Sequence, residues 1–303
     1  MKQMKGGVAV VTGGGSGLGK AIAEAAARRE MKVVLVDVQA DVLEQTVQEL
    51  RSQGAEVIGV ATDVSDAAAV QALANRAEQH FGPVNLLFNN AGVATGGLVW
   101  ENTEKDWEWL LGVNLKGVVN GVRCFTPRML AAAAADANYQ GCIINTASMA
   151  GLLTAPGMGI YSVSKHAVLA LSECLYHDLA LVTRQLQTAV LCPSYVTTNI
   201  GESQRNRPTQ LANGEAPTKS QVATRAGTQK DLDNGAISAD DVAEITFKAI
   251  ESGTFYIFPS PEVLPLVKVR TEHILDGTNP NLPYEQVPVL KERRDRLLAA
   301  IAN

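Results

Sequence analysis

Short runs of β-branched and other apolar residues alternate with longer, alanine-rich amphipathic stretches from Gly7 to about Val190. This alternation predicts repeated βα units, in which each helix returns the chain to a parallel sheet. The apolar runs are continuous, as expected of strands that are covered by helices on both faces. Strands are expected at Val8–Val11, Lys32–Val36, Val57–Ala61, Leu86–Phe88, Cys142–Asn145 and Thr188–Leu191. Helices are expected at about Gly17–Arg29, Asp41–Gln53, Asp66–His80, Thr103–Met129 and Ile160–Thr183.

A seventh unit follows near the C-terminal end. Ser238 precedes two aspartates, which is typical of a helix N-cap with an acidic first turn, and Phe255–Phe258 is expected to be the last strand. The pattern as a whole predicts an α/β fold with a doubly wound, mainly seven-stranded parallel sheet and helices on both faces. We expect residues 1–303 to form a single domain.

Two further segments differ from this pattern. Residues 194–236 are rich in Gln, Asn, Thr, Gly and Pro, which favours a lid or binding loop over the substrate, with a disordered segment as the alternative. Residues 264–303 are expected to be a C-terminal extension. Its tail from Thr271 holds three prolines and then a charged helix at about Leu290–Ile301, interpreted as a solvated helix that covers the sheet or a neighbouring subunit.

Composition narrows the class of protein. The chain is 46% hydrophobic and 19% charged, which does not fit disorder, and its net charge of −5 without a long basic run argues against nucleic acid or an anionic membrane surface as a partner. A small-molecule ligand is expected instead. The four cysteines and four histidines show no metal-ligand spacing, so no metal site is expected. Met1–Gly7 lead directly into an apolar run too short to span a membrane, which favours a reducing cytoplasm.

A glycine-rich loop, Thr12–Gly19, separates the first expected strand from the first expected helix. Backbone amides at a helix N-terminus can hold a pyrophosphate, and glycine lets the chain approach it closely. The glycines follow a G-x-x-x-G-x-G spacing at Gly13, Gly17 and Gly19, and we expect Ser16 and Leu18 to contact the cofactor with them. This loop predicts a Rossmann-type dinucleotide site. The alternative without a ligand is a tight βα turn.

A P-loop competes for the same stretch, because Gly14 to Lys20 also satisfies G-x-x-x-x-G-K. A P-loop needs a hydroxyl for magnesium directly after the lysine, and this chain has Ala21 there. Asp37 ends the second strand about twenty residues past the loop, where a carboxylate can bind the adenine ribose and repel a 2′-phosphate. With Val38 next to it and no lysine or arginine at Ser16, NAD is preferred over NADP.

A phenol and an amine share one helix face further along the chain. Tyr161 and Lys165 are spaced i, i+4, so a fixed ammonium could lower the pKa of the phenol enough for proton exchange near neutrality. Ser148 lies thirteen residues upstream, just past a strand, at the sheet edge where open α/β sheets bind ligands. Its hydroxyl can donate a hydrogen bond to a substrate oxygen.

In these residues the chain resembles the classical short-chain dehydrogenase/reductase family over roughly Lys5 to Phe258. The motifs that carry the resemblance, in chain order, are the Thr12–Gly19 loop, Asp63, Asn89-Asn90-Ala91-Gly92, Asn114, Ser148, and Tyr161 with Lys165. The resemblance implies that Tyr161 is the general acid/base, that Lys165 lowers its pKa and holds the nicotinamide ribose, that Ser148 orients the carbonyl or alcohol, and that Asn114 supports a water-linked proton path. It also implies cofactor contacts by Asp63, Val64, Asn90, Gly92, Pro193, Val196 and Thr198. The family usually has Pro-Gly where this chain has Pro193-Ser194, which puts the backbone path there in doubt.

The expected reaction is hydride transfer between NAD and a secondary alcohol or ketone, bulky, aromatic or cyclic. The apolar lining is expected to comprise Val93, Ala94, Leu98, Met149, Leu152, Leu153 and Tyr195, of which Met149 and Tyr195, together with Ser148 and Tyr161, are predicted to bind the substrate. Segments such as Val113–Gly117 and Pro259–Val263 are similar to bacterial dehydrogenases that oxidise the benzylic alcohol of lignin-type aryl ethers. A dinucleotide-binding sensor without turnover, and a non-redox dehydratase or epimerase, remain as alternatives. The resemblance also implies a homo-oligomer, a dimer or tetramer, paired through the helices at Thr103–Met129 and Ile160–Thr183.

Overall fold

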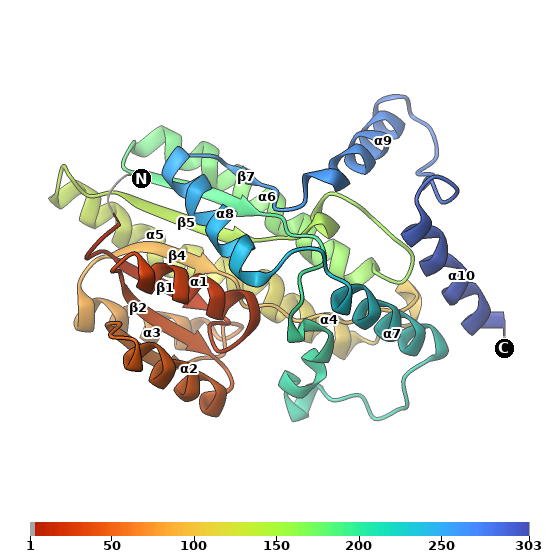
Figure 1. Cartoon of the computed structure of the whole chain (residues 1–303), viewed down its shortest axis with the longest axis horizontal. Helices are drawn as coiled ribbons and strands as arrows, with labels where there is room; N and C mark the ends of the chain where they lie inside the picture. The colour runs from red at the N-terminus through yellow and green to blue at the C-terminus, as the bar shows by residue number, and fades with distance from the viewer. Residues whose placement is uncertain (1–3, 303) are drawn as a thin grey trace.

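A seven-stranded parallel sheet forms the centre of the protein, with the strand order β3-β2-β1-β4-β5-β6-β7 (Figure 1). The computed structural model describes residues 4–302. The strands are β1 (Val8–Thr12), β2 (Lys32–Asp37), β3 (Val57–Ala61), β4 (Val84–Asn89), β5 (Gly141–Thr146), β6 (Leu186–Leu191) and β7 (Tyr256–Ile257). The expected doubly wound α/β fold of the Rossmann type is therefore confirmed.

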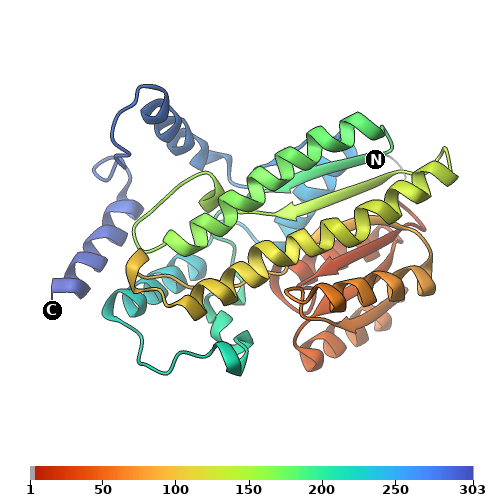
Figure 2. The ribbon, with the colours of Figure 1, turned by 180° about the vertical axis from the view of Figure 1, so that it is seen from behind.

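Helices cover both faces of the sheet, because consecutive strand residues point to opposite sides and both sides are apolar. In β1, Ala9 and Val11 pack into the core on one face, and Val8 and Val10 pack into the core on the other. The first face is covered by α1 (Gly17–Arg28), α2 (Ala40–Ser52) and α8 (Ala239–Ser252). The second is covered by α3 (Ala67–Phe81), α5 (Gly117–Ala135) and α6 (Gly159–Val182), of which α5 and α6 lie in front in Figure 2.

The strand order reverses direction at β1, which lies between β2 and β4. The loops that leave the carboxyl ends of β1 and β4 therefore diverge to opposite sides and leave a crevice between them. β5 and β6 end at the same edge. The residues predicted to bind the cofactor or to perform the chemistry follow the strands that end at this edge.

One expected helix, Thr103–Met129, is three elements in the structure. α4 (Glu104–Leu111) is followed by a π-helical turn, η2 (Gly112–Lys116), before α5 begins. The buried side chain of Asn114 in this turn exchanges two hydrogen bonds with the backbone of Val93. A local helix period cannot indicate such a turn, because a π-turn depends on a partner from a distant loop.

Residues 194–236 contain more regular structure than expected. Two 3₁₀ segments, η4 (Asn199–Asn206) and η5 (Thr209–Leu211), precede α7 (Lys219–Asp233), a helix that the sequence reasoning missed. α7 has a capping box between Thr218 and Gln221 but no apolar stripe that would indicate a helix. At its start, the hydroxyl groups of Thr218 and Ser220 donate hydrogen bonds to Glu101. Short 3₁₀ turns also lie at η1 (Val99–Glu101), η3 (Met149–Gly151) and η6 (Pro261–Val263).

The C-terminal segment holds two helices, α9 (Leu264–Leu275) and α10 (Pro288–Ala302). The sequence reasoning missed α9. It expected the last helix to cover the sheet or another subunit, whereas α10 packs on α7 at the far end of the molecule from the N-terminus (Figure 1). The interpretation that this helix covers the sheet was wrong, because its buried Arg293 pairs with Asp231 of α7 and its buried Leu297 faces the loop before α6.

Among residues 4–302, no helix has the length and apolar character needed to cross a membrane. The first part of the Met1–Gly7 segment lies outside the described residues.

Candidate active site

The glycine loop after β1 adopts a backbone that only glycine tolerates well. Gly13 and Gly17 have φ angles of +65° and +53°, in the left-handed region. A Cβ at Gly19 would lie 2.0 Å from the carbonyl oxygen of Gly13, so the helix can start this close only without a side chain. Ser16 is the N-cap of α1 but its side chain accepts no capping bond, and the first turn holds no acidic residue. The amides of this turn are thus available to an anion, and the loop fits a dinucleotide diphosphate.

Asp37 lies beside this loop at the end of β2. Its Oδ2 accepts a hydrogen bond from the amide of Gly15 at 3.0 Å, and its Oδ1 accepts one from the amide of Gln39 at 3.0 Å. Each carboxylate oxygen keeps a lone pair for a further donor, which suits two ribose hydroxyl groups.

Arg205 reaches the same end of the site from η4. Its Nε donates to Oε1 of Gln39 at 3.3 Å, and its Nη1 donates to the carbonyl of Asn199 at 2.9 Å. No local pattern indicates this cation, because Arg205 is 168 positions from Asp37 and reaches this end of the site only through the fold.

Thr12 joins the ends of β1 and β4. Its Oγ1 accepts hydrogen bonds from the amides of Asn90, at 2.9 Å, and Ala91, at 3.0 Å, and the side chain of Asn90 returns a bond to the carbonyl of Thr12 at 3.0 Å. Asp63 holds a tight turn after β3 by accepting bonds from the amide and the hydroxyl of Ser65. Both turns face the crevice, and Asp63, Val64, Asn90 and Gly92 line it.

Asn114 is fully buried behind the crevice. Its Oδ1 accepts from the amide of Val93 at 2.8 Å, and its Nδ2 donates to the carbonyl of Val93 at 3.0 Å and to Ser164 Oγ at 3.2 Å. Both N–H groups of the amide are therefore used, and the side chain fixes the Val93 loop to α6. It does not line the pocket itself.

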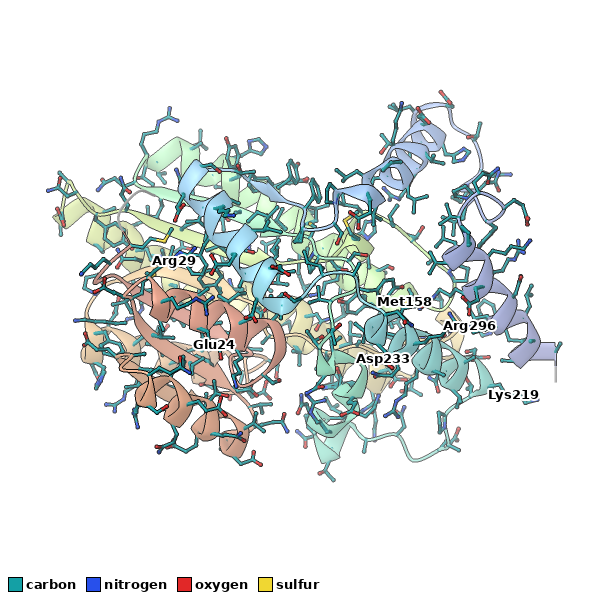
Figure 3. The ribbon with its side chains drawn as sticks, viewed as in Figure 1. Glu24, Arg29, Met158, Lys219, Asp233 and Arg296 are labelled. Atoms are coloured by element: carbon teal, nitrogen blue, oxygen red, sulfur yellow. The ribbon has the colours of Figure 1, made fainter. Side chains whose placement is uncertain are left out.

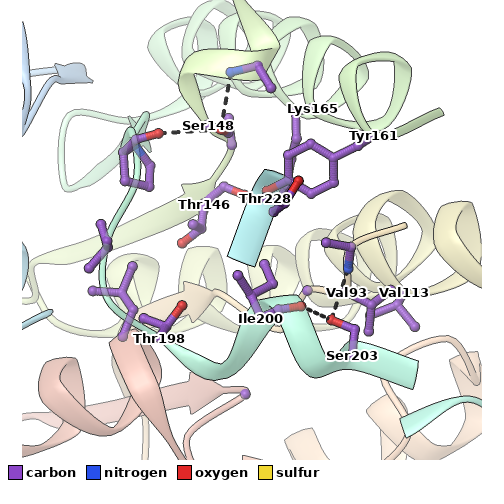
Figure 4. Close-up of a pocket in the computed structure, with 18 of the residues that line it drawn as sticks. Val93, Val113, Thr146, Ser148, Tyr161, Lys165, Thr198, Ile200, Ser203 and Thr228 are labelled. Atoms are coloured by element: carbon purple, nitrogen blue, oxygen red, sulfur yellow. Dashed lines mark hydrogen bonds between the residues drawn. The ribbon is translucent and has the colours of Figure 1, made fainter. Parts of the chain in front are cut away.

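The three residues predicted to perform the chemistry lie together at one side of the pocket (Figure 4). Tyr161 and Lys165 come from successive turns of α6, and Ser148 caps η3 directly after β5. The Lys165 ammonium lies 5.7 Å from the centre of the Tyr161 ring and donates to the carbonyl of Thr146 at 2.9 Å. Ser148 Oγ accepts from the amide of Ala150 at 3.1 Å.

Burial governs the protonation of these side chains. It raises the pKa of Tyr161 to about 12, which the hydroxyl of Ser148 beside it partly opposes. Burial also lowers the pKa of Lys165 to about 8, which the Cys192 thiol partly opposes. The sequence led us to expect that Lys165 lowers the pKa of Tyr161, but desolvation of the phenolate dominates and the pKa is raised.

The loop after β6 forms a further wall of the pocket. The carbonyl of Pro193 accepts hydrogen bonds from the amide of Met149 at 2.9 Å and from Ser148 Oγ at 3.3 Å. Thr198 packs against the glycine loop: a Cβ built on Gly17 would lie 3.2 Å from the Cβ of Thr198. The Pro193-Ser194 sequence is thus compatible with a loop that runs from Ser148 to the glycines.

These elements enclose a pocket of about 780 Å³. The predicted residues that line it are Gly13, Ser16, Gly17, Leu18, Gly19, Asp37, Asp63, Val64, Asn90, Gly92, Ser148, Met149, Tyr161, Lys165, Pro193, Tyr195, Val196 and Thr198. Val93, Ala94 and Leu153 line it as well, whereas Leu98 and Leu152 do not, and their expected place in the lining was wrong. Leu98 is held outside by a bond from its amide to Ser220 Oγ, and Leu152 packs into a core cluster.

The pocket also has walls that the sequence reasoning missed. Thr228 and Leu232 come from α7, and Leu266, Leu290 and Arg293 come from the C-terminal segment. None of them belongs to a local motif. The competing P-loop interpretation requires Lys20 to face a bound phosphate. Lys20 instead pairs with Glu49 of α2 and does not line the pocket.

Among residues 4–302, no group of three or more His, Cys, Asp or Glu side chains is placed to hold a metal ion.

Comparison with known proteins agrees with this geometry. A sequence model described as short chain dehydrogenase matches residues 7–209, from before β1 to η5. A solved short chain dehydrogenase/reductase from Burkholderia phymatum, in complex with NAD, is 49% identical, has a TM-score of 0.91, and the alignment covers 93% of this chain and 99% of that one.

Two relatives of known description align over nearly the whole chain. The CLA biosynthesis dehydrogenase/reductase of Lactiplantibacillus plantarum is 35% identical, over 93% of this chain and 98% of the relative. The C alpha-dehydrogenase of Sphingobium sp. (strain NBRC 103272 / SYK-6) is 31% identical, over 92% of this chain and 89% of the relative.

Proposed function

The chain belongs to the short-chain dehydrogenase family, and from this premise we propose that it is an NAD-dependent oxidoreductase that interconverts a secondary alcohol and its ketone. One observation carries the proposal. Tyr161, Lys165 and Ser148 lie together in the wall of the pocket that also contains the glycine loop, so a reacting carbon can meet both the acid/base group and a dinucleotide. The NAD complex of the Burkholderia phymatum protein supports the choice of cofactor.

The dinucleotide would be held along the crevice. The amides of Gly17, Leu18 and Gly19 would bind the diphosphate, Asp37 the adenosine ribose, and Asp63 and Val64 the adenine. When bound, NAD supplies the hydride acceptor or donor. The residues of this chain orient the substrate and move its proton.

In alcohol oxidation, Tyr161 would accept the hydroxyl proton while the carbinol hydrogen leaves as hydride, and in ketone reduction it would donate the proton. Ser148 Oγ would position the substrate oxygen beside the phenol. The Lys165 ammonium, held on the Thr146 carbonyl, would favour the phenolate electrostatically and bind the nicotinamide ribose. Asn114 would support the proton path by fixing the Val93 loop to the helix that carries Tyr161.

We further propose that NAD is used in preference to NADP. A carboxylate at Asp37 accepts hydrogen bonds from ribose hydroxyls and repels a 2′-phosphate. Arg205 lies at the same end and would attract such a phosphate, so the preference depends on the balance of these two charges.

The proposed substrate is bulky and aromatic or cyclic. The pocket wall around Tyr161 is largely apolar, with Met149, Leu153, Tyr195 and Leu232 among its members. The similarity to a C alpha-dehydrogenase supports a substrate of this kind, in agreement with the benzylic alcohols suggested by the sequence.

Replacing Tyr161 by phenylalanine tests the central role. Tyr161→Phe removes only the hydroxyl, so we expect NAD to bind within about twofold of the wild type while kcat for a panel of aromatic and cyclic alcohols falls about a thousandfold. NAD binding is measured by calorimetry and turnover by NADH absorbance. Tyr176→Phe is the matched control, because Tyr176 is half-exposed on the same helix and outside the pocket lining. Near-normal turnover by Tyr161→Phe would refute the role.

Two other activities remain testable with the same panel. A sensor would bind NAD without forming NADH from any alcohol. A dehydratase or epimerase would convert its substrate with no net change in NADH. Product analysis alongside absorbance therefore separates all three.

We also propose a homo-oligomer in a reducing, cytoplasmic compartment. The exposed apolar side chains of α6, including Leu181 and Val182, support association through this helix. The four cysteines are unpaired, three of them buried, which suits a reducing compartment.

A further inference from the structure

We propose that the C-terminal helix α10 forms part of the substrate site, closing the far end of the pocket over an elongated apolar alcohol or ketone, and that Arg293 is the positioning residue that holds it there. This inference rests on the proposed function and deepens it by naming the shape of the substrate. It concerns a segment beyond residues 7–209, the part matched by the short chain dehydrogenase model.

Arg293 links three parts of the pocket wall. Its Nη1 donates to the hydroxyl of Tyr195 at 2.8 Å and to Oδ2 of Asp231 at 3.3 Å, and its Nη2 donates to Thr228 Oγ1 at 3.4 Å. Tyr195 follows β6, whereas Thr228 and Asp231 belong to α7. One side chain of α10 thereby ties the helix to two walls of the pocket.

The tie is buried, so water does not replace it easily. The side chains of Arg293 and Asp231 are 6% and 8% exposed. Separating the pair would leave the buried Arg293 guanidinium without a carboxylate, while Asp231 would keep Arg296 at 3.7 Å. A buried charge without its partner is far less favourable than a separated surface pair. The ion pair therefore strongly favours the position of α10 in which it packs on α7 and beside Tyr195.

Two close contacts stabilise α10 in this position. Leu297 is buried, and a Cβ at Gly157 would lie 3.3 Å from its Cδ1, so α10 reaches the loop just before the helix that carries Tyr161. A Cβ at Gly227 of α7 would lie 3.4 Å from Cζ of Arg296, which Figure 3 labels on α10. Of the two glycines, Gly157 is the one that the backbone requires, since its φ of +76° lies in the left-handed region.

In this position, the C-terminal segment (residues 261–302) presents a mostly apolar surface to the pocket. The apolar side chains that the C-terminal segment contributes to the pocket lining include Val263, Leu266, Val287 and Leu290, and the charged ones are Glu262 and Arg293. Of the two charged members, Arg293 is neutralised by Asp231, and Glu262 is exposed. A ligand that extends from Tyr161 to this surface should therefore be apolar at its distal end.

A homologous substrate series measures the contribution of this surface. We expect wild-type kcat/KM for 2-alkanols, and for 1-arylethanols with longer para-alkyl groups, to rise up to about fourfold per added methylene that contacts α10 and its neighbours. Arg293→Asp places a carboxylate beside that of Asp231, so repulsion replaces the ion pair and α10 should no longer pack on α7. In this variant we expect the gain in kcat/KM per added methylene to fall from up to about fourfold to about one, that is, to no gain.

A charge swap keeps the test independent of general destabilisation. Asp231→Arg combined with Arg293→Asp restores an ion pair in reverse. Both the single variant and the swap are made with Arg296→Met, because Arg296 Nη2 lies 3.7 Å from Asp231 Oδ1 and would repel the new arginine. We expect the swap to recover part of the length dependence. Lys291→Met is the matched control, because Lys291 is an exposed cation of the same helix paired with Glu285, and it should retain the wild-type dependence. Circular dichroism of each variant verifies folding, and NAD affinity should be unchanged.

A second measurement does not depend on turnover. The binding of ketones of increasing length, in the presence of NAD, is followed by quenching of tryptophan fluorescence, to which Trp109 in the pocket wall contributes. Affinity should rise with length in the wild type and not in Arg293→Asp.

The outcomes separate the two proposals. An unchanged length dependence in Arg293→Asp, in both turnover and binding, would overturn the role of α10 and leave the proposed function intact. Absence of NADH formation by the wild type with every alcohol would count against the proposed function, while the binding series would still decide the role of α10.

Discussion

Lys165 combines a predicted catalytic role with a cost in stability. The ammonium is almost fully buried, and burial lowers its pKa from the ordinary 10.5 to about 8. Such a lowering corresponds to about 3 kcal/mol of unfavourable interaction for the charged form. Its hydrogen bond to the Thr146 carbonyl recovers part of this, on the order of 1 kcal/mol.

Lys165→Met should therefore abolish activity and stabilise the protein. At pH 7 we expect the free energy of unfolding to rise by about 1–2 kcal/mol, because an apolar side chain replaces a buried charge and the Thr146 carbonyl loses its donor. The folded pKa lies below the unfolded one, so the native lysine binds fewer protons between about pH 8 and 10.5, and wild-type stability gains relative to the variant across that window.

Urea unfolding at pH 7 and at pH 10 measures this difference. The stability advantage of the variant should be present at pH 7 and largely lost at pH 10. Lys248→Met, at an exposed position of α8, should change the unfolding free energy by less than about 0.5 kcal/mol at either pH. A variant that is less stable than the wild type at pH 7 would contradict the argument.

Asp37 and Arg205 set the predicted cofactor preference. Asp37→Asn keeps an oxygen acceptor but removes the negative charge, so we expect the ratio of kcat/KM for NADP to that for NAD to rise at least about tenfold. Asp41→Asn, a few residues further on the exposed first turn of α2, is the control and should leave the ratio unchanged. Adding Arg205→Met to Asp37→Asn should lower NADP use again. An unchanged ratio in Asp37→Asn would disprove the assignment.

At the scale of elements, the segment between β6 and α8 is held to the sheet domain by a buried ion pair. Arg207 Nη1 lies 2.6 Å from Oδ1 of Asp106 on α4, with 6% and 2% of the two side chains exposed, and the guanidinium stacks over Trp109. Burial alone would raise the pKa of Asp106, but hydrogen bonds from the Thr103 backbone and from Arg207 outweigh it and hold the pKa below its usual value. The pair fixes η5, whose Leu211 lines the pocket.

Arg207→Met should leave the Asp106 carboxylate buried without its cation. We expect the free energy of unfolding to fall by about 3 kcal/mol at pH 7, together with a raised KM for substrate. Because the folded pKa of Asp106 is depressed, its stabilising contribution is present above pH 4 and lost as the pH falls further, so the difference from the wild type should shrink in acid.

Urea unfolding at pH 7 and at pH 3 measures this effect. Arg225→Met, an exposed position on α7, is the control with an expected change within about 0.5 kcal/mol. Equal stability of Arg207→Met and the wild type at pH 7 would show that the pair does not hold this segment.

At the scale of the whole molecule, α5 and α6 lie together on one face (Figure 2). On α6 the apolar side chains of Val163, Leu181 and Val182 are exposed. We expect light scattering to give a mass that is a dimeric or tetrameric multiple of the 32.1 kDa chain. Leu181→Glu, at a position that is 85% exposed on α6, should lower that mass, because a charge would be buried in the interface. Leu298→Glu, at 59% exposure on α10, should leave it unchanged. A monomeric wild type would disprove the association.

The sequence alone determined the sheet, the glycine loop and the spacing of Tyr161 and Lys165. These features depend on residues near one another in the chain: β-branched runs become strands, glycines allow a positive φ, and i, i+4 positions share a helix face. Six of the seven strands agree with the expected ranges to within two residues, and the short β7 lies inside its expected range.

Only the tertiary structure decided what surrounds those features. It brought Arg205 to the adenosine end, Arg293 and α10 to the substrate end, and Asn114 to the Val93 backbone, and it gave Tyr161 and Lys165 their shifted pKa values through burial. Such contacts join residues far apart in the chain, and desolvation depends on everything packed around a group. Neither leaves a local pattern, so neither can be derived from the order of residues along one segment.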